Sequence, residues 1–255
     1  MNLNHKVIMV IGAAGTLGKA MSSAILEQGA FLIAVDNSNE ALDGLKLALN
    51  NHDRASFFTA DITNVESIQG VINQAVHLHG ALHGAVNTAY PRNKNYGRDF
   101  FNVTFEDFSE NLSLHLGGYF LFMQQCAKYS MDTGNSFSLV NISSIYGVIP
   151  PRFDIYDNTP MTMPVEYAAI KSALIHLSKF TSTYMKNTRF RVNSVSPGGI
   201  LAAQPESFVD AYRGYSRVKG MLDAKDVVGT IMFLLSEDSE YMCGQNLVVD
   251  DGFSL

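Results

Sequence analysis

The sequence predicts a single α/β domain: one doubly wound parallel sheet with helices on both faces. Short runs of β-branched and other apolar residues, such as Val7 to Ile11 and Phe31 to Val35, alternate along the chain with stretches of helical period. These runs are apolar at consecutive positions, as strands buried on both faces of a parallel sheet are. No linker or low-complexity segment interrupts the alternation, so residues 1–255 are expected to form one domain.

Each expected strand is a short run that is followed by a turn or a helical stretch. The expected strands are Val7–Ile11, Phe31–Val35, Ser56–Thr59, Gly84–Asn87, Ser138–Ile142, Arg191–Val195 and Asn246–Val249. The expected helices run from a glycine-rich turn to about Gln28, from just after Asp36, over about 65–78, and over Phe105–Tyr129, Pro164–Met185 and about Ala224–Leu235. Strands that each lead into a helix are typical of a parallel sheet.

Composition and charge exclude several classes of protein. The chain has 255 residues, of which 47% are hydrophobic and 16% charged, enough to bury ~70–75% of its unfolded surface in one domain. A net charge of −6 without a basic run argues against a nucleic-acid partner. No apolar stretch approaches the ~18–20 residues of a membrane span, and the first six residues leave no room for a signal peptide. Cys126 and Cys243 suggest neither a disulfide framework nor a metal site. We therefore expect a cytoplasmic globular protein without a metal.

The segment Tyr167-Ala168-Ala169-Ile170-Lys171 carries a candidate acid/base pair. Apolar residues recur there at spacings of three and four, so the segment is expected to be helical, with Tyr167 and Lys171 on one face. A free phenol has a pKa near ~10, and bringing it to about 7 needs ~4 kcal/mol. One positive charge ~4–5 Å away at an effective dielectric of ~20 supplies that order of energy. Such a pair also occurs by chance in many helices, so it needs support from other parts of the chain.

A glycine-rich turn follows the first expected strand. Gly12, Gly15 and Gly18 allow a tight turn whose N–H groups can approach a pyrophosphate at the start of a helix. Asp36 ends the next expected strand, 18 residues after Gly18. A carboxylate there can accept both ribose hydroxyls of an adenosine and would repel a 2′-phosphate, which indicates NAD as the cofactor.

With these features the whole chain resembles the short-chain dehydrogenase/reductase family, which has a Rossmann-type fold. Tyr167 and Lys171 match the family's Y-x-x-x-K, and Ser144 falls where the family has its catalytic serine. Further matches lie at Asp61-Ile62, Asn87-Thr88-Ala89-Tyr90, Pro197-Gly198, Gly244-Gln245 and Val249-Asp250-Asp251-Gly252. The resemblance implies hydride transfer between nicotinamide and a secondary alcohol or ketone. In it Tyr167 would exchange the hydroxyl proton, Ser144 would bond the carbonyl oxygen, and Lys171 would lower the pKa of the phenol and bind ribose.

The resemblance also implies a set of cofactor-binding residues, from which the sequence departs in places. The set is Gly12, Gly15, Thr16, Leu17, Gly18, Asp36, Asp61, Ile62, Asn87, Ala89, Tyr167, Lys171, Pro197, Gly198 and Ile200. Ile11 and Thr16 break the family's T-G-x-x-x-G-x-G, Thr88 and Tyr90 break its N-N-A-G, and Ala202 replaces a Thr. His115 falls where many members have an Asn that orients a water near the Lys. We include His115 among the catalytic residues, because an imidazole with a pKa of ~6.5 can hold a water or relay a proton.

Two loops are expected to border the substrate. Between Ser144 and Tyr167 lie 22 residues, which we interpret as an inserted loop that includes Arg152. The loop Pro91–Arg98 holds three basic residues and no acid, and Tyr90 precedes it. Tyr90, Arg92 and Arg152 are therefore the predicted substrate-binding residues, and the predicted substrate is polar, hydroxylated and anionic. The whole pattern also resembles the branch of the family found in bacterial surface-sugar and flagellin-modification pathways.

Two alternatives stay open at this point. One is a 3-oxoacyl-(acyl-carrier-protein) reductase, which also needs basic groups. Such an enzyme would prefer NADPH, and Asp36 argues against this alternative because its carboxylate would repel the 2′-phosphate. The other is a catalytically silent NAD-binding regulator. The presence of Ser144, Tyr167 and Lys171 argues against this alternative. The family resemblance further implies a homodimer or homotetramer assembled through the expected helices near 105–129 and 167–186.

Overall fold

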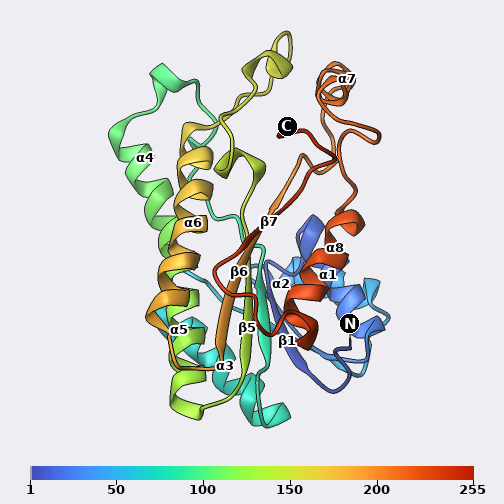
Figure 1. Ribbon diagram of the computed structural model, residues 1–255, viewed down its shortest axis with the longest axis vertical. Helices are drawn as coiled ribbons and strands as arrows, with labels where there is room; N and C mark the ends of the chain where they lie inside the picture. The colour runs from blue at the N-terminus through green and yellow to red at the C-terminus, as the bar shows by residue number, and fades with distance from the viewer. Residues whose placement is uncertain (1) are drawn as a thin grey trace.

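The computed structural model describes residues 2–255 and has one seven-stranded sheet with helices on both faces (Figure 1). The strands are β1 (Val7–Ile11), β2 (Phe31–Asp36), β3 (Ala55–Thr59), β4 (Gly84–Asn87), β5 (Phe137–Ile142), β6 (Phe190–Pro197) and β7 (Asn246–Val249). They lie in the order β3-β2-β1-β4-β5-β6-β7, and every neighbouring pair is parallel. The predicted fold class is confirmed. The strand order reverses between β1 and β4, and open α/β sheets bind their ligands at such a switch point.

In the described part of the chain, eight α-helices connect the strands. They are α1 (Thr16–Glu27), α2 (Asn39–Ala48), α3 (Val65–His79), α4 (Phe105–Asn111), α5 (Gly118–Thr133), α6 (Val165–Tyr184), α7 (Glu206–Gly214) and α8 (Ala224–Leu235). Among residues 2–255, no helix is long and apolar enough to span a bilayer.

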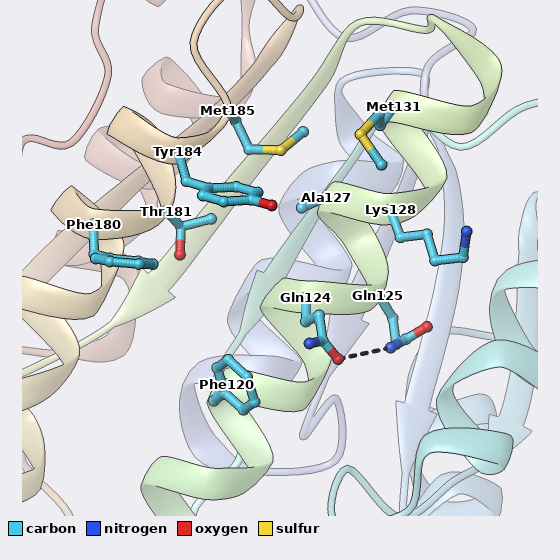
Figure 2. A pocket seen from close by; sticks show the side chains of 10 residues that line it. All are labelled: Phe120, Gln124, Gln125, Ala127, Lys128, Met131, Phe180, Thr181, Tyr184 and Met185. Carbon is cyan, nitrogen blue, oxygen red and sulfur yellow. Dashed lines mark hydrogen bonds between the residues drawn. The ribbon is translucent and has the colours of Figure 1, made fainter.

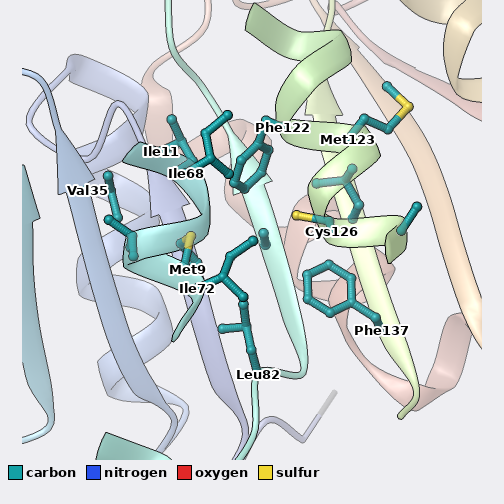
Figure 3. Close-up of a cluster of buried hydrophobic side chains, with 14 of the residues drawn as sticks. Met9, Ile11, Val35, Ile68, Ile72, Leu82, Phe122, Met123, Cys126 and Phe137 are labelled. Carbon is teal, nitrogen blue, oxygen red and sulfur yellow. The ribbon is translucent and has the colours of Figure 1, made fainter. Parts of the chain in front are cut away.

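Two hydrophobic cores fill the two sides of the sheet. On one side α3 and α5 contribute Ile68, Ile72, Phe122 and Cys126 to a cluster that also contains side chains of β1, β2 and β5 (Figure 3). On the other side α1 and α8 bury Met21, Ile25, Ile231 and Leu234 together with side chains of β1, β2, β4, β5 and β6. Because the central strands β1, β4 and β5 have buried side chains on both faces, their runs of consecutive apolar residues are explained, whereas the edge strands β3 and β7 are only partly buried.

The prediction of one continuous helix over 105–129 is wrong. Helix α4 ends at Asn111, a π-helical turn follows over Leu112–Gly117, and α5 continues to Thr133. A wide turn of this kind shifts the buried face of a helix by about one residue and is often found at functional sites. Here it includes His115, which is fully buried. At the start of α5, Gly118 lies so close to the sheet layer that a Cβ there would be 2.8 Å from Ile62 Cδ1.

A third, smaller hydrophobic cluster lies beside the carboxyl ends of the strands. It joins residues of the loop after β5, of α7 and of the C-terminal segment: Ile145, Tyr146, Ile155, Phe208, Tyr212, Met221 and Phe253. Helix α7 and the C-terminus lie together at the top of Figure 1. The helical character of α7 was not predicted from the sequence.

Candidate active site

The glycine-rich turn between β1 and α1 packs tightly against the end of β4. Gly12 has a φ of +73°, and a Cβ there would be 2.9 Å from Ala89 N. A Cβ at Gly18 would be 2.1 Å from Gly12 O, so the turn requires glycine at both positions. Thr88, which replaces the family's second Asn, donates a 2.8 Å hydrogen bond from its hydroxyl to Ile11 O. The Thr88 hydroxyl therefore links the end of β4 to the glycine turn by a hydrogen bond.

The predicted cofactor residues of the first half of the chain gather around one cleft of about 220 Å³. Gly12, Gly15, Asp36, Asp61, Ile62 and Ala89 all line it. Asp36 is half-buried and accepts a 3.1 Å hydrogen bond from Ala14 N, which ties its carboxylate to the glycine turn. Thr16, Leu17 and Gly18 form the first turn of α1. Asn87 is buried, and its Oδ1 accepts a hydrogen bond from Ala89 N at 3.1 Å.

Ser144, Tyr167 and Lys171 come together at the carboxyl end of β5. Ser144 starts a short 3-10 turn, and its Oγ accepts a hydrogen bond from Tyr146 N at 3.2 Å. Tyr167 and Lys171 lie one turn apart on α6 as predicted. The Lys171 ammonium donates to Ile142 O at 2.8 Å, and the centroid of the Tyr167 ring lies 5.6 Å from its Nζ.

Lys171 is almost completely buried among aromatic rings. Besides Tyr167, the rings of Tyr119 and Tyr90 lie 5.2 and 5.9 Å from its Nζ, and the lysine is 4% exposed. Burial lowers the pKa of Lys171 from 10.5 to about 7. The lysine is therefore deprotonated much more easily near neutral pH than an exposed lysine is.

The pKa of the Tyr167 phenol departs from the sequence-based expectation. Burial raises this pKa above 10.0, and a hydrogen bond with the Ser144 side chain acts in the opposite direction. We expected Lys171 to lower it. The structure differs because the lysine ammonium is directed to Ile142 O and His115 and because its own burial makes it easier to deprotonate.

His115 contacts Lys171 directly. Its Nε2 lies 3.3 Å from Lys171 Nζ, and burial together with the charges of Lys171 and Arg92 lowers the pKa of His115 to about 2. The imidazole is therefore neutral at physiological pH and can accept a hydrogen bond from the ammonium. The edge of the His115 ring also packs against Tyr90, with centroids 5.1 Å apart. His115 thus lies among the catalytic candidates, as the sequence predicted.

A second cavity, of about 390 Å³, adjoins the catalytic residues, and no charged residue lines it. Ser144, Tyr167, Pro197, Gly198 and Ile200 form one side of it. The remaining lining is mainly aromatic and thioether side chains: Tyr90, Tyr146, Tyr156, Met161, Met163, Phe208, Tyr212 and Met221. Tyr90 lines this cavity and also the cofactor cleft, so the two hollows meet at its ring.

Of the predicted basic substrate residues, only Arg92 lies at this site with a free charge. Its guanidinium covers the Tyr90 ring at 4.9 Å from the centroid, and the side chain is exposed. Arg98 forms a 2.9 Å ion pair with Asp107. Arg152 does not line the cavity: it donates to Phe253 O at 3.1 Å and to Leu255 O at 3.2 Å, and it stacks over Tyr215 at 4.2 Å. The prediction that Arg152 binds substrate is therefore corrected, because its guanidinium holds the C-terminal segment.

Tyr156, Phe208 and Tyr212 line the cavity but were not predicted from the sequence. Tyr156 lies in the inserted loop between Ser144 and Tyr167, where its aromatic side chain was the available signal. Phe208 and Tyr212 are four residues apart on α7 and buried. That spacing is an amphipathic pattern, which was overlooked because the segment is short and polar overall.

Comparisons with known proteins cover the whole chain. A family model described as Enoyl-(Acyl carrier protein) reductase matches residues 12–254. A Post-translational flagellin modification protein A of Campylobacter coli is 39% identical over 258 residues, covering 99% of this chain and 100% of that protein. The 3-oxoacyl-[acyl-carrier-protein] reductase FabG of Thermotoga maritima is 31% identical, with 99% of each chain covered. The crystal structure of a short chain dehydrogenase from Leptospira borgpetersenii with bound NAD+ has a TM-score of 0.87 at 29% identity, covering 99% of this chain and 94% of that one.

Proposed function

The chain belongs to the short-chain dehydrogenase/reductase family, and from this premise we propose an NAD-dependent oxidoreductase that interconverts a secondary alcohol and a ketone on a polar, sugar-like substrate. One observation carries the proposal: the cleft below the glycine turn and the cavity beside Ser144 and Tyr167 meet at Tyr90. An extended dinucleotide bound at the glycine turn can therefore reach the acid/base group.

The chain's own residues account for the proton transfer. The Ser144 hydroxyl can donate a hydrogen bond to the substrate oxygen, which stabilises charge that develops there. The Tyr167 phenol, which is bonded to Ser144, gives its proton to that oxygen in reduction and removes it in oxidation. Lys171 can then supply a proton to the phenol, because its pKa of about 7 lets it exchange protons at neutral pH. His115 accepts a hydrogen bond from Lys171 and so holds its ammonium in place.

The residues of the cleft fit NAD. Gly12 and Gly15 leave room for close approach of a pyrophosphate to the start of α1, and Asp36 presents a half-buried carboxylate to the same cleft. When bound, NAD supplies the hydride acceptor or donor at its nicotinamide. Asp36 is followed by Asn37, Ser38 and Asn39, none of which can neutralise a 2′-phosphate. We therefore propose a preference for NAD(H) over NADP(H).

The substrate proposal combines the cavity with Arg92. The uncharged cavity suits a neutral ring, whose C–H faces can pack on aromatic side chains while its hydroxyls meet phenols. The exposed Arg92 beside Tyr90 is placed to pair with a phosphate or carboxylate outside the cavity. The similarity to a flagellin modification protein supports a role in the modification of surface sugars in the cytoplasm.

A second candidate function is the reduction of acyl-carrier thioesters. The thioether-rich lining of the cavity and the 31% identity to a 3-oxoacyl-[acyl-carrier-protein] reductase favour it. Asp36 argues against it, since such a reductase is expected to use NADPH.

We also propose that the chain forms a dimer through α5 and α6. A groove between these helices is lined by Phe120, Met131, Phe180 and Tyr184 (Figure 2), each of which is at least 45% exposed. Large aromatic side chains exposed together on two adjacent helices are typical of an interface. The same face on a second copy would cover them.

A turnover screen tests the function. The purified protein is incubated with NAD+ or NADP+ and with neutral, phosphorylated and nucleotide-linked sugars, and reduced nicotinamide is measured by absorbance. We expect NAD+ reduction with at least one sugar and none by Tyr167→Phe. Reduction of acetoacetyl thioesters with NADPH, without activity on any sugar, would support the second candidate instead.

A further inference from the structure

The backbone turn that follows β6 is held by a tyrosine of α7. The strand ends at Pro197, and Gly198 N donates to Val249 O at 2.8 Å. The next N–H, that of Gly199, donates to Tyr212 Oη at 2.7 Å. Tyr212 is only 2% exposed, so this hydrogen bond is shielded from water.

The Tyr212 side chain also fills the space beside both glycines. A Cβ at Gly198 would lie 2.7 Å from Tyr212 Oη, and a Cβ at Gly199 would lie 3.0 Å from its Cε2. A side chain at Gly198 would therefore displace the Tyr212 hydroxyl, and one at Gly199 would press against the Tyr212 ring. The phenol and the two-glycine turn are complementary in shape as well as in hydrogen bonding.

The C-terminal segment fixes the other face of the Tyr212 ring. Phe253 is fully buried and stacks on Tyr212 with ring centroids 4.0 Å apart and planes 13° apart. Asp250 accepts hydrogen bonds from Gly252 N at 2.9 Å and Ser254 N at 2.8 Å, and Arg152 bonds Phe253 O at 3.1 Å. The ring of Tyr212 is thus enclosed between the turn and the chain end.

The turn lies where the far end of a dinucleotide would arrive. Gly198 and Gly199 line the same cavity as Ser144 and Tyr167, whereas Asp36 lines the cleft on the other side of Tyr90. If adenosine is bound at Asp36, the nicotinamide lies beside the two glycines. This step rests on the proposed function.

We infer that Tyr212 is a positioning residue for the nicotinamide half of NAD. It holds the Gly198–Gly199 turn in the conformation that receives the nicotinamide, and Phe253 holds Tyr212. Because α7 also contributes Phe208 to the cavity wall, the same helix links the cofactor turn to the substrate cavity.

Isothermal titration of NAD+ and ADP-ribose tests this inference, because ADP-ribose lacks the nicotinamide. Tyr212→Phe removes the acceptor of the Gly199 N–H and keeps the ring. We expect it to raise the ratio of the NAD+ Kd to the ADP-ribose Kd by about five- to tenfold, as loss of a buried hydrogen bond would. The matched control is Tyr215→Phe, whose hydroxyl bonds Asp154 instead of the turn. It should leave the ratio unchanged.

A second variant, Phe253→Leu, loosens the Tyr212 ring without touching the turn and should shift the ratio in the same direction by a smaller factor. An unchanged ratio in both variants, or an equal weakening of NAD+ and ADP-ribose, would overturn the inference while the proposed function stands. If the wild-type protein binds neither ligand, the proposed function fails and the inference fails with it.

Discussion

The burial of Lys171 makes a prediction about stability that needs no substrate. Its ammonium is surrounded by the rings of Tyr90, Tyr119 and Tyr167 and has Ile142 O as its shortest hydrogen-bond partner. Burial lowers the pKa of Lys171 to about 7, against 10.5 for an ordinary lysine. The folded protein must therefore hold a poorly solvated charge below pH 7, and it releases that proton more easily than the unfolded chain does.

The sign and size of the effect follow from proton linkage. Between about pH 7 and about pH 10.5 the unfolded chain binds more protons at this lysine than the folded protein, so the free energy of unfolding rises with pH. The full difference between the two pKa values corresponds to roughly 5 kcal/mol, at about 1.36 kcal/mol per pKa unit. Between about pH 7.5 and about pH 9.5 the expected gain is about 2–3 kcal/mol.

Urea unfolding of the wild type and of Lys171→Met, without added NAD, measures this gain. The difference in free energy of unfolding between the two proteins should change by about 2–3 kcal/mol over that range, since all other titrating groups cancel. Lys179→Met, an exposed lysine on the same helix, is the control and should give no such change. Parallel pH curves for the wild type and Lys171→Met would refute the argument that burial lowers the pKa of this lysine.

Four other predictions concern the proposed function. Tyr167→Phe is expected to lower the rate of hydride transfer at least ~10²-fold while NAD+ binding hardly changes; near-normal single-turnover rates would show that the phenol is not the acid/base group. NAD+ should bind at least tenfold more tightly than NADP+, or about 1.4 kcal/mol, because Asp36 repels a 2′-phosphate; equal Kd values by calorimetry would contradict this. Arg92→Ala is expected to raise KM for an anionic substrate, at a cost of roughly 1.5–3 kcal/mol, with cofactor affinity unchanged; an unchanged KM, or a neutral substrate, would disprove the pairing. Phe180→Asp should shift the protein toward monomer in sedimentation equilibrium, whereas a dimer as tight as the wild type would exclude this face as the interface.

The strands and the catalytic group could be predicted because their signals are local. A run such as Leu32 to Val35 is apolar at every position, since both faces of the sheet are buried there. Tyr167 and Lys171 share a helix, so their spacing alone puts them on one face. The glycines of the first turn are dictated by backbone contacts within a few residues or with the adjacent strand.

The break between α4 and α5 could not be predicted from periodicity. Leu112, Leu116 and Phe120 continue a helical spacing through the π turn, so the pattern shows no interruption. Tertiary contacts account for the π turn: Gly118 packs on Ile62, and the buried His115 contacts Lys171. Such contacts join segments more than fifty residues apart.

The role of Arg152 was missed for a related reason. Its partner Phe253 O lies 101 residues further along the chain, and clustering of basic residues in sequence says nothing about that contact. The other predicted substrate loop, Pro91–Arg98, contains Arg98, whose charge is paired with Asp107. Arg92 has an exposed charge beside Tyr90, whereas the charge of Arg98 is paired and the guanidinium of Arg152 is bonded to the C-terminal segment, so the count of basic residues overstated the positive charge available to a substrate.

The side chains that line the cavity bear on the choice between the two proposed substrate classes, a sugar and an acyl chain. Five tyrosines line it, together with methionines and Phe208, and the inserted loop contributes Tyr156, Met161 and Met163. A hydrocarbon chain would pack on the rings but would offer the phenol hydroxyls no partner. Tyr90 and Tyr212 already bond Tyr96 Oη and Gly199 N, each at 2.7 Å, so this matters chiefly for Tyr146 and Tyr156, at about 1–3 kcal/mol for each hydroxyl that loses water. The Tyr156 hydroxyl donates a hydrogen bond to the thioether sulfur of Met163, a weak acceptor, at 3.3 Å. A ring that carries hydroxyls could offer these two phenols a better partner while its C–H faces cover the same aromatic surface, and this supports our proposal of a polyhydroxylated substrate even though the methionines of the wall also suit an acyl chain.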